Sequence, residues 1–319
     1  MKKTIFILIY FLFYGIYSFA QSAEEYLKMA IEANDRGEDA EAVSYFEKAA
    51  KLGNDVAQFN YGICYYLGHV LTQDYEKAVY WFRSAASQGN ALAQYNLGWC
   101  YFNGKGVKTD YDQAVIWYKL SAAQGDADAQ NSLGNCYYYG KGVDLNYKEA
   151  IKWYEYAAEQ GHSEAIYNLG QCYYLDSPIQ NYTKAVFWFI KSADKDNVMA
   201  QHNLAICYSQ GKGVSKNLEK AIMWDMKAAE QGLDRAQYDI GLCYYNGNGL
   251  EKDYYKAVYW YRKAANQGYA PAQRNLGLCY GLGNGVKKDV IIAKNWLQKA
   301  ALQGDDKAKQ ALNLLKIEK

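Results

Sequence analysis

The chain has 319 residues, with 35 basic and 34 acidic residues and a formal net charge of +1. This near balance, without a basic run, excludes the electrostatic footprint of a nucleic-acid binding protein. Two prolines and 16% aromatic residues exclude a disordered or collagen-like chain. The composition therefore indicates a folded chain, and its organisation follows from internal patterns.

The first twenty residues have the pattern of an export signal. Lys2 and Lys3 supply the charged start, residues 5–17 are largely apolar, and Ala20 completes a small-x-small cleavage site. We expect a signal peptide over residues 1–20 and an exported protein, periplasmic or secreted. An uncleaved anchor is the alternative, although the apolar run is short for a membrane span. After the leader no apolar stretch approaches the span length of about twenty residues, so no transmembrane span is expected there.

A short motif recurs through the rest of the chain and carries every cysteine. One copy reads LGNCYYYGKGV at residues 133–143. The cysteines recur at steps of 35 or 36 residues, at Cys64, Cys100, Cys136, Cys172, Cys207, Cys243 and Cys279. Tryptophans keep the same period, at Trp81, Trp117, Trp153, Trp188, Trp224, Trp260 and Trp296. Two residue types with one such period predict stacked supersecondary units rather than a single globular core.

Residues 93–128 show the structure expected of one unit. Ala93, Leu97 and Cys100 lie at i, i+4 and i+7, which predicts a helix with one apolar face. A Gly-Lys-Gly turn follows, and a second helix with apolar residues at three- and four-residue spacing begins at Asp110. Each repeat is therefore predicted to be a helical hairpin.

The predicted ends of the second helices carry residues that favour helix caps. The N-cap slot holds Asp74, Asp110, Asn146, Asn181, Asn217, Asp253 and Asp289. The C-terminal slot holds Gly53, Gly89, Gly125, Gly161, Gly232, Gly268 and Gly304, with Asp196 in the fourth repeat. That repeat also lacks the Gly-x-Gly turn and is one residue short. We therefore expect it to be the least stable repeat.

The motif A-Q-x-N-L-G-x-C-Y-x-x-G-x-G-V, followed by D-Y-x-x-A-x-x-W-Y-x-x-A-A-x-Q-G, resembles the Sel-one-like repeat, a relative of the tetratricopeptide repeat. The resemblance implies an all-α solenoid of stacked helix-turn-helix repeats of about 36 residues. Its seven copies are placed at residues 57–92, 93–128, 129–164, 165–199, 200–235, 236–271 and 272–304. Residues 21–56 are interpreted as an N-terminal capping unit and residues 305–319 as a C-terminal capping helix.

The cysteines are expected to be free, buried thiols, because they share the apolar face of the first helix. Equivalent helices of adjacent repeats should lie about 10 Å apart or more, whereas a disulfide needs Cα atoms within about 7 Å. The resemblance includes a cysteine-rich branch with disulfides. That branch has two cysteines per repeat, whereas this chain has one, so no disulfide is expected.

Other signs of chemistry are weak. The Gly-Lys-Gly copies lack the Lys-Ser/Thr of a phosphate loop and follow a helix rather than a strand. Ser192 and Ser209 begin S-x-x-K matches to β-lactamases, a label that some relatives have carried, but neither S-D-N nor K-T-G occurs. His69, His162 and His202 lie in different repeats without ligand spacing, so neither a metal nor a cofactor is expected. Asn181 begins a glycosylation acceptor that matters only in a eukaryotic secretory route.

The remaining candidate is a surface, because the resemblance implies that first helices line the concave side of a superhelix. One slot there, which we name the asparagine row, holds Asn60, Asn96, Ser132, Asn168, Asn203, Asp239 and Asn275. Its aromatic neighbours are Phe59, Tyr66, Tyr95, Trp99, Phe102, Tyr138, Tyr167, Tyr174, Tyr238 and Tyr245. Asparagine is a poor mid-helix residue, so its repetition requires a reason.

The sequence predicts a non-catalytic scaffold that binds a protein or an extended peptide. The hypothesis assigns contacts to the asparagines of the row and to all of these aromatics except Phe59 and Tyr66. Alternatively, the asparagines bind local backbone or the adjacent hairpin, and the tyrosines only coat the surface. A saccharide-binding module and a β-lactamase-like hydrolase are the other functional alternatives.

Overall fold

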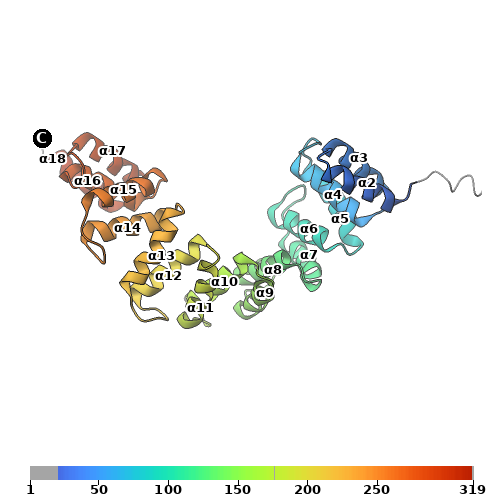
Figure 1. The fold of residues 1–319 in the computed structure, drawn as a ribbon, viewed down its shortest axis with the longest axis horizontal. Helices are drawn as coiled ribbons and strands as arrows, with labels where there is room; N and C mark the ends of the chain where they lie inside the picture. The colour runs from blue at the N-terminus through green and yellow to red at the C-terminus, as the bar shows by residue number, and fades with distance from the viewer. Residues whose placement is uncertain (1–20, 176, 318–319) are drawn as a thin grey trace, which may run out of the picture. The chain divides into compact units, whose positions relative to one another are not determined.

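The structure, a computed structural model, describes residues 21–175 and 177–317. Across these residues the chain forms helices α2 to α18 and no strand (Figure 1). Consecutive helices pack as hairpins with a repeat of about 36 residues, so the prediction of an all-α solenoid is confirmed. The expected signal peptide at residues 1–20 lies outside the described residues.

The described residues divide into two compact units, one that ends at His162 and one that begins at Ser163. The first unit contains α2 (Ala23–Asp35), α3 (Asp39–Lys51), α4 (Asp55–Leu67), α5 (Tyr75–Ser87), α6 (Ala91–Asn103), α7 (Tyr111–Ala123), α8 (Ala127–Tyr139) and α9 (Tyr147–Glu159). The second contains α10 (Ser163–Tyr174), α11 (Tyr182–Ala193), α12 (Val198–Gln210), α13 (Leu218–Glu230), α14 (Asp234–Asn246), α15 (Tyr254–Asn266), α16 (Ala270–Leu282), α17 (Val290–Leu302) and α18 (Asp306–Ile317). The first helices of the repeats begin two residues before the repeat frame that the sequence suggested.

The packing of the helices combines small residues with, in most repeats, one large ring of the second helix. In the second repeat Ala93, Leu97 and Cys100 of α6 are buried, as the helical spacing predicted, and they pack against α5 of the preceding repeat. Within the hairpin itself, Tyr118 of α7 packs on α6 at Gly98. A Cβ at Gly98 would lie 2.8 Å from the Tyr118 ring, so only glycine lets the ring approach α6 this closely. The same contact joins Gly62 to Phe82, Gly134 to Tyr154, Gly170 to Phe189 and Gly241 to Tyr261, and Leu297 replaces the ring at Gly277.

The predicted caps of the second helices are confirmed. The Asp110 carboxylate accepts a hydrogen bond from the backbone N–H of Gln113 at 2.9 Å, and each of the other predicted N-cap side chains accepts an equivalent bond. The glycines that follow the second helices have positive φ. Asp196 has φ 60° and is the only non-glycine residue with positive φ in the described part of the chain. The fourth repeat therefore has a strained helix end.

A buried glutamine of the first helix pairs with an exposed glutamine at the end of the second helix, and both bind carbonyls of the preceding repeat, a feature that the sequence analysis missed. The Gln124 amide donates to the Gln94 side-chain oxygen at 2.8 Å and to the Gly89 carbonyl at 2.9 Å, while Gln94 donates to the Ala86 carbonyl at 3.1 Å. Equivalent side-chain bonds join Gln58 to Gln88, Gln130 to Gln160, Gln201 to Gln231, Gln237 to Gln267 and Gln273 to Gln303. We name these pairs the glutamine ladder.

The fourth repeat has no glutamine pair, because Ile166 and Lys195 occupy the two ladder positions. It therefore lacks the ladder pair and the capping glycine that the other six repeats have, and the Gly-x-Gly turn that five of them have. All three stabilise helix ends or contacts between repeats elsewhere in the chain.

The two ends of the array are also closed by helices. At the start of α2 the Ser22 hydroxyl accepts from the Glu25 N–H, and the Glu25 carboxylate accepts from the Ser22 N–H. At the other end α18 packs on α17 through buried Ala308. None of the described helices is both long and apolar enough to cross a membrane.

Candidate functional site

Each member of the asparagine row lies half-buried on the first helix of its repeat. The Asn60 amide donates to the Val56 carbonyl, and the Asn96 amide donates to the Leu92 carbonyl, both at 2.8 Å. In these two repeats the amide therefore binds local backbone, which was the alternative to peptide binding. One amide hydrogen and the carbonyl oxygen of each side chain are not used in that bond.

In the second unit the row is linked between repeats. The Asn203 amide donates to the Tyr167 hydroxyl at 3.4 Å, across 36 positions of sequence. This bond brings together two residues that the sequence analysis assigned to the same surface. It also gives part of the row a scaffolding role.

The aromatic neighbours of the row are half-buried and pack on the core rings. Tyr95 lies on Tyr118 with ring centroids 5.9 Å apart, and Tyr238 lies on Tyr261 at the same distance. Between repeats of the first unit, Tyr66 meets Trp99 edge to face at 5.8 Å. Packing therefore fixes the orientation of these rings while leaving part of each surface exposed.

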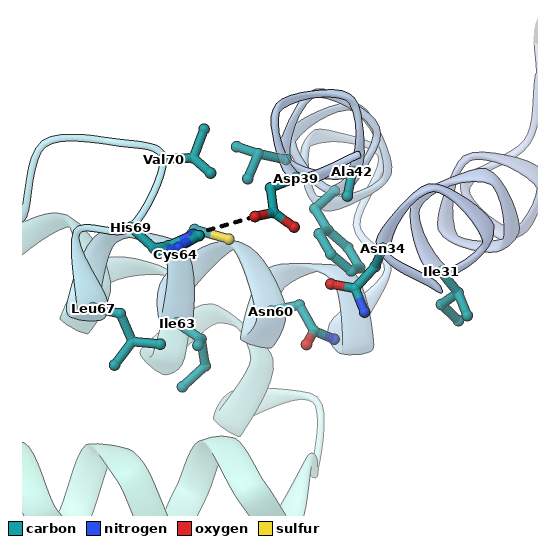
Figure 2. Close-up of a pocket in the computed structure, with 12 residues that line it drawn as sticks. Ile31, Asn34, Asp39, Ala42, Asn60, Ile63, Cys64, Leu67, His69 and Val70 are labelled. Atoms are coloured by element: carbon teal, nitrogen blue, oxygen red, sulfur yellow. Dashed lines mark ion pairs between the residues drawn. The ribbon is translucent and has the colours of Figure 1, made fainter. Parts of the chain in front are cut away.

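A cavity of about 320 Å³ lies in the first unit beside the first member of the row (Figure 2). It is lined by Ile31, Asn34, Asp39, Ala42, Val43, Phe46, Asn60, Ile63, Cys64, Leu67, His69 and Val70. Apolar side chains from α2, α3 and α4 form most of this lining, and a few polar groups are interspersed. Of the residues assigned from sequence, only Asn60 reaches this cavity.

Cys64 lies in this cavity near an ion pair between His69 and Asp39, whose nitrogen and oxygen atoms are 3.5 Å apart (Figure 2). Burial raises the pKa of the Cys64 thiol, and the Asp39 carboxylate raises it further. The thiol is therefore held in its protonated form, which is a poor nucleophile. This arrangement does not favour cysteine chemistry.

All seven cysteines are free thiols in the structure, but they are not equally covered. Five are buried, whereas Cys64 and Cys243 are half-buried, which corrects the expectation that all seven are buried. Burial raises the pKa of Cys100, Cys136, Cys172 and Cys279 to about 12. These four side chains act as small core residues.

The Gly-Lys-Gly and S-x-x-K motifs serve the fold rather than a reaction. Gly106 has φ 69°, and a Cβ there would lie 2.1 Å from the Tyr75 carbonyl oxygen, so this Gly-Lys-Gly copy is a tight turn packed on α5. Ser192 is 1% exposed, and no described group forms a hydrogen bond with its hydroxyl. The Ser209 hydroxyl donates to the Ile206 carbonyl at 3.0 Å. Neither serine is presented as a nucleophile.

One histidine lies in a buried cluster that the sequence analysis missed. His202 of α12 is 5% exposed, and its Nδ1 lies 2.7 Å from the Asp225 carboxylate of α13. Asp239 of α14 completes the cluster, in which one nitrogen and two carboxylate oxygens all lie within 4.8 Å of one another. The histidines had been judged to lack ligand spacing, and the carboxylates that approach His202 come from two other helices.

The pKa values of all three side chains in the cluster are raised. Burial raises the pKa of Asp239 to about 6, and the nearby Asp225 carboxylate adds to the shift. Burial also raises the pKa of Asp225, although His202 opposes the shift. Burial alone would lower the pKa of His202, but its hydrogen bond to Asp225 and the charge of Asp225 raise it. The sequence signal was available, since Asp225 occupies a core slot that holds an aromatic residue or a leucine elsewhere.

Comparison with known proteins places these observations in a family. A model of the Sel1 repeat matches residues 38–54, 55–90, 91–126, 127–162, 163–197, 198–233, 234–269 and 270–305. No curated protein matches the chain.

Two solved structures share the arrangement. A protective antigen of uropathogenic Escherichia coli with an SLR fold is 34% identical with a TM-score of 0.81, over 93% of this chain and 65% of that one. The chain thus spans less than two thirds of the length of that antigen. A Sel1 repeat protein from Oxalobacter formigenes is 29% identical with a TM-score of 0.75, over 92% of this chain and 86% of that one. The chain therefore belongs to the Sel1-repeat family, whose members are typically protein-interaction scaffolds.

Proposed function

We propose that the chain is an exported, non-catalytic scaffold that binds an extended segment of another protein along the asparagine row. The observation that carries the proposal is the repeated pairing of a half-buried polar slot with half-buried aromatic rings on successive first helices. An extended peptide exposes N–H and C=O groups at regular intervals, and a carboxamide can serve both. Fixed tyrosine and tryptophan rings supply apolar area at low entropic cost.

The cavity beside Asn60 supports this proposal in the first unit. Its walls are largely apolar, and Asn34 and Asn60 add amide groups at its edge. Such a lining favours one apolar side chain of the partner, with polar groups fixing the direction of the chain. The partner is therefore proposed to carry an aliphatic or aromatic anchor at the end that meets the first unit.

Sel1-repeat proteins are typically interaction scaffolds, and this supports the same proposal. A saccharide ligand is the second candidate, because half-buried aromatic rings also stack on sugars. Glycan binding requires exposed ring faces, whereas Tyr95, Tyr167 and Tyr238 each pack against a core ring. Peptide binding is therefore preferred.

The chain, purified without its leader, would be applied in parallel to a peptide array and a glycan array. Binding of extended peptides with an apolar anchor, without glycan binding, is the expected result. Binding to glycans alone would refute the proposal. Fractionation of the source cells tests export separately, and retention in the cytoplasm would contradict it. Hydrolysis of a chromogenic β-lactam would contradict the absence of catalysis.

A further inference from the structure

The fifth repeat departs from the others where a second-helix side chain packs on the first helix. In the other repeats this second-helix position holds an aromatic residue or leucine, whereas the fifth repeat has Asp225. The first-helix glycine that faces this position is replaced by Ala205 in the fifth repeat. The two changes belong together, because a Cβ on α12 is tolerated once no ring packs there. The result is a carboxylate at a core position, which is costly unless another group compensates its charge.

Two further side chains converge on that carboxylate from neighbouring helices. His202 approaches within 2.7 Å and is almost fully buried, and Asp239 is the only carboxylate in the asparagine row. The side chain of Asp225 is itself only 13% exposed. Three helices of the second unit therefore place one imidazole and two carboxylates around a common point.

The two carboxylates of the cluster share one basic partner, His202, which bonds to Asp225. No described group donates a hydrogen bond to the Asp239 carboxylate. Around the cluster, α14 also carries Arg235 and Cys243, and Tyr269 approaches from the start of α16. Arg235 forms no ion pair with Asp239 among the described residues. A dication at the common point of the three side chains would compensate both carboxylates.

We propose that His202, Asp225 and Asp239 bind one divalent first-row transition-metal cation, with Zn²⁺ as the reference ion. An imidazole nitrogen with two carboxylate oxygens suits Zn²⁺ and its neighbours in the series. Ca²⁺ takes six to eight oxygen ligands, and Mg²⁺ prefers octahedral oxygen coordination, so neither matches this donor set. Three protein ligands leave one tetrahedral position for water.

The geometry needs only side-chain adjustment. Bonds of about 2.0–2.2 Å in a tetrahedron separate the ligand atoms by about 3.4 Å. The present separations, from 2.7 Å for the His202–Asp225 pair to at most 4.8 Å across the cluster, bracket that value. On binding, the ligating imidazole must be neutral, so the imidazolium releases one proton to solvent and Asp225 exchanges its hydrogen bond for a metal bond.

The test is calorimetric titration of the chain with Zn²⁺ at pH 7.5 in the presence of a non-thiol reductant. We expect one bound ion and a raised melting temperature. His202→Gln, Asp225→Asn and Asp239→Asn should each weaken Zn²⁺ binding by about tenfold or more. His162→Gln is the matched control, because His162 pairs with Asp128 at 3.0 Å outside the cluster. It should leave the affinity unchanged.

A fourfold variant, which we call the repaired variant, separates loss of metal binding from loss of folding. It combines His202→Tyr, Ala205→Gly, Asp225→Tyr and Asp239→Asn, and so introduces the residues that the second repeat holds at these slots. We expect it to fold and to lose the bound Zn²⁺. The Co²⁺ complex of the unmodified chain should show ligand-field absorption without a thiolate charge-transfer band. Absence of Zn²⁺ uptake by the unmodified chain, equal uptake by the repaired variant, or a thiolate band would each overturn the proposal.

Discussion

At the scale of single residues, a glycine of the first helix allows close contact with the core ring of the second helix in the hairpins that have such a ring. Gly98→Ala would place a Cβ 2.8 Å from the Tyr118 ring and force the ring or helix to move. We expect the free energy of unfolding to fall by about 1–3 kcal/mol, as for other overpacked cores. Urea unfolding followed by circular dichroism measures the change.

Gly281→Ala is the matched control, because a Cβ at this helical glycine would meet only Ala293 at 3.8 Å. There the higher helix propensity of alanine should dominate and stabilise the protein by about 0.5–1 kcal/mol. If both alanine variants change stability in the same direction, ring contact does not explain the glycine at position 98.

The thiols offer a second test at this scale. With a pKa of about 12, Cys100, Cys136, Cys172 and Cys279 have a thiolate fraction of about one in ten thousand at pH 8. Native alkylation followed by mass spectrometry should label Cys64 and Cys243 first, because these two are half-buried. All seven should label after unfolding. Rapid native labelling of the buried four would contradict the burial described here.

At the scale of helices and turns, the glutamine ladder connects consecutive hairpins. Gln124→Ala removes the donor to Gln94 and to the Gly89 carbonyl, and leaves a buried side-chain oxygen unpaired. The expected loss is about 1–3 kcal/mol of unfolding free energy. Gln210→Ala, at an exposed position of α12, is the control and should be nearly neutral. Equal effects would show that the ladder contributes little.

The fourth repeat should exchange its amides fastest, because Ile166 and Lys195 cannot form a ladder pair and Asp196 is held at φ 60°. In a nearest-neighbour array such a defect lowers protection locally. Hydrogen exchange should be faster in α10 and α11 than in α6, α7, α14 and α15. Asp196→Gly should slow it by relieving backbone strain. Equal protection in all of these helices would refute the expectation.

The helix caps could be predicted from the sequence, whereas the glutamine ladder and the His202 cluster could not. Cap residues and the helical period depend on local spacing, so Asp110 and the capping glycines were identified without coordinates. The ladder was not identified, although both glutamines stand in the repeat motif, because the motif does not show that two side chains 30 residues apart meet across one hairpin and reach carbonyls of the preceding repeat. The His202 cluster was missed for a related reason: its three groups come from three helices of two adjacent repeats, and the sequence does not show that they converge.

At the scale of the whole molecule, the spacing of the asparagine row suits an extended peptide, whose side chains and backbone groups recur at regular intervals. Such a chain rises about 3.3 Å per residue, and equivalent helices of stacked repeats lie about 10 Å apart or more. One repeat therefore matches about three residues of the partner. Within each unit, the asparagine row and its aromatic neighbours could contact every third side chain on one face of the peptide.

The most direct test of this account is the affinity of an array-selected peptide for the triple variant Asn96→Ala, Asn168→Ala and Asn203→Ala, measured by fluorescence anisotropy. Asn103→Ala is the control, because Asn103 makes the same kind of bond to its own helix, 3.0 Å from its amide to the Trp99 carbonyl, outside the row. We predict about tenfold or more weaker peptide binding by the triple variant, with unchanged helical content, and normal binding by the control. Normal binding by the triple variant together with a much lower melting temperature would assign these asparagines to the scaffold and contradict the account.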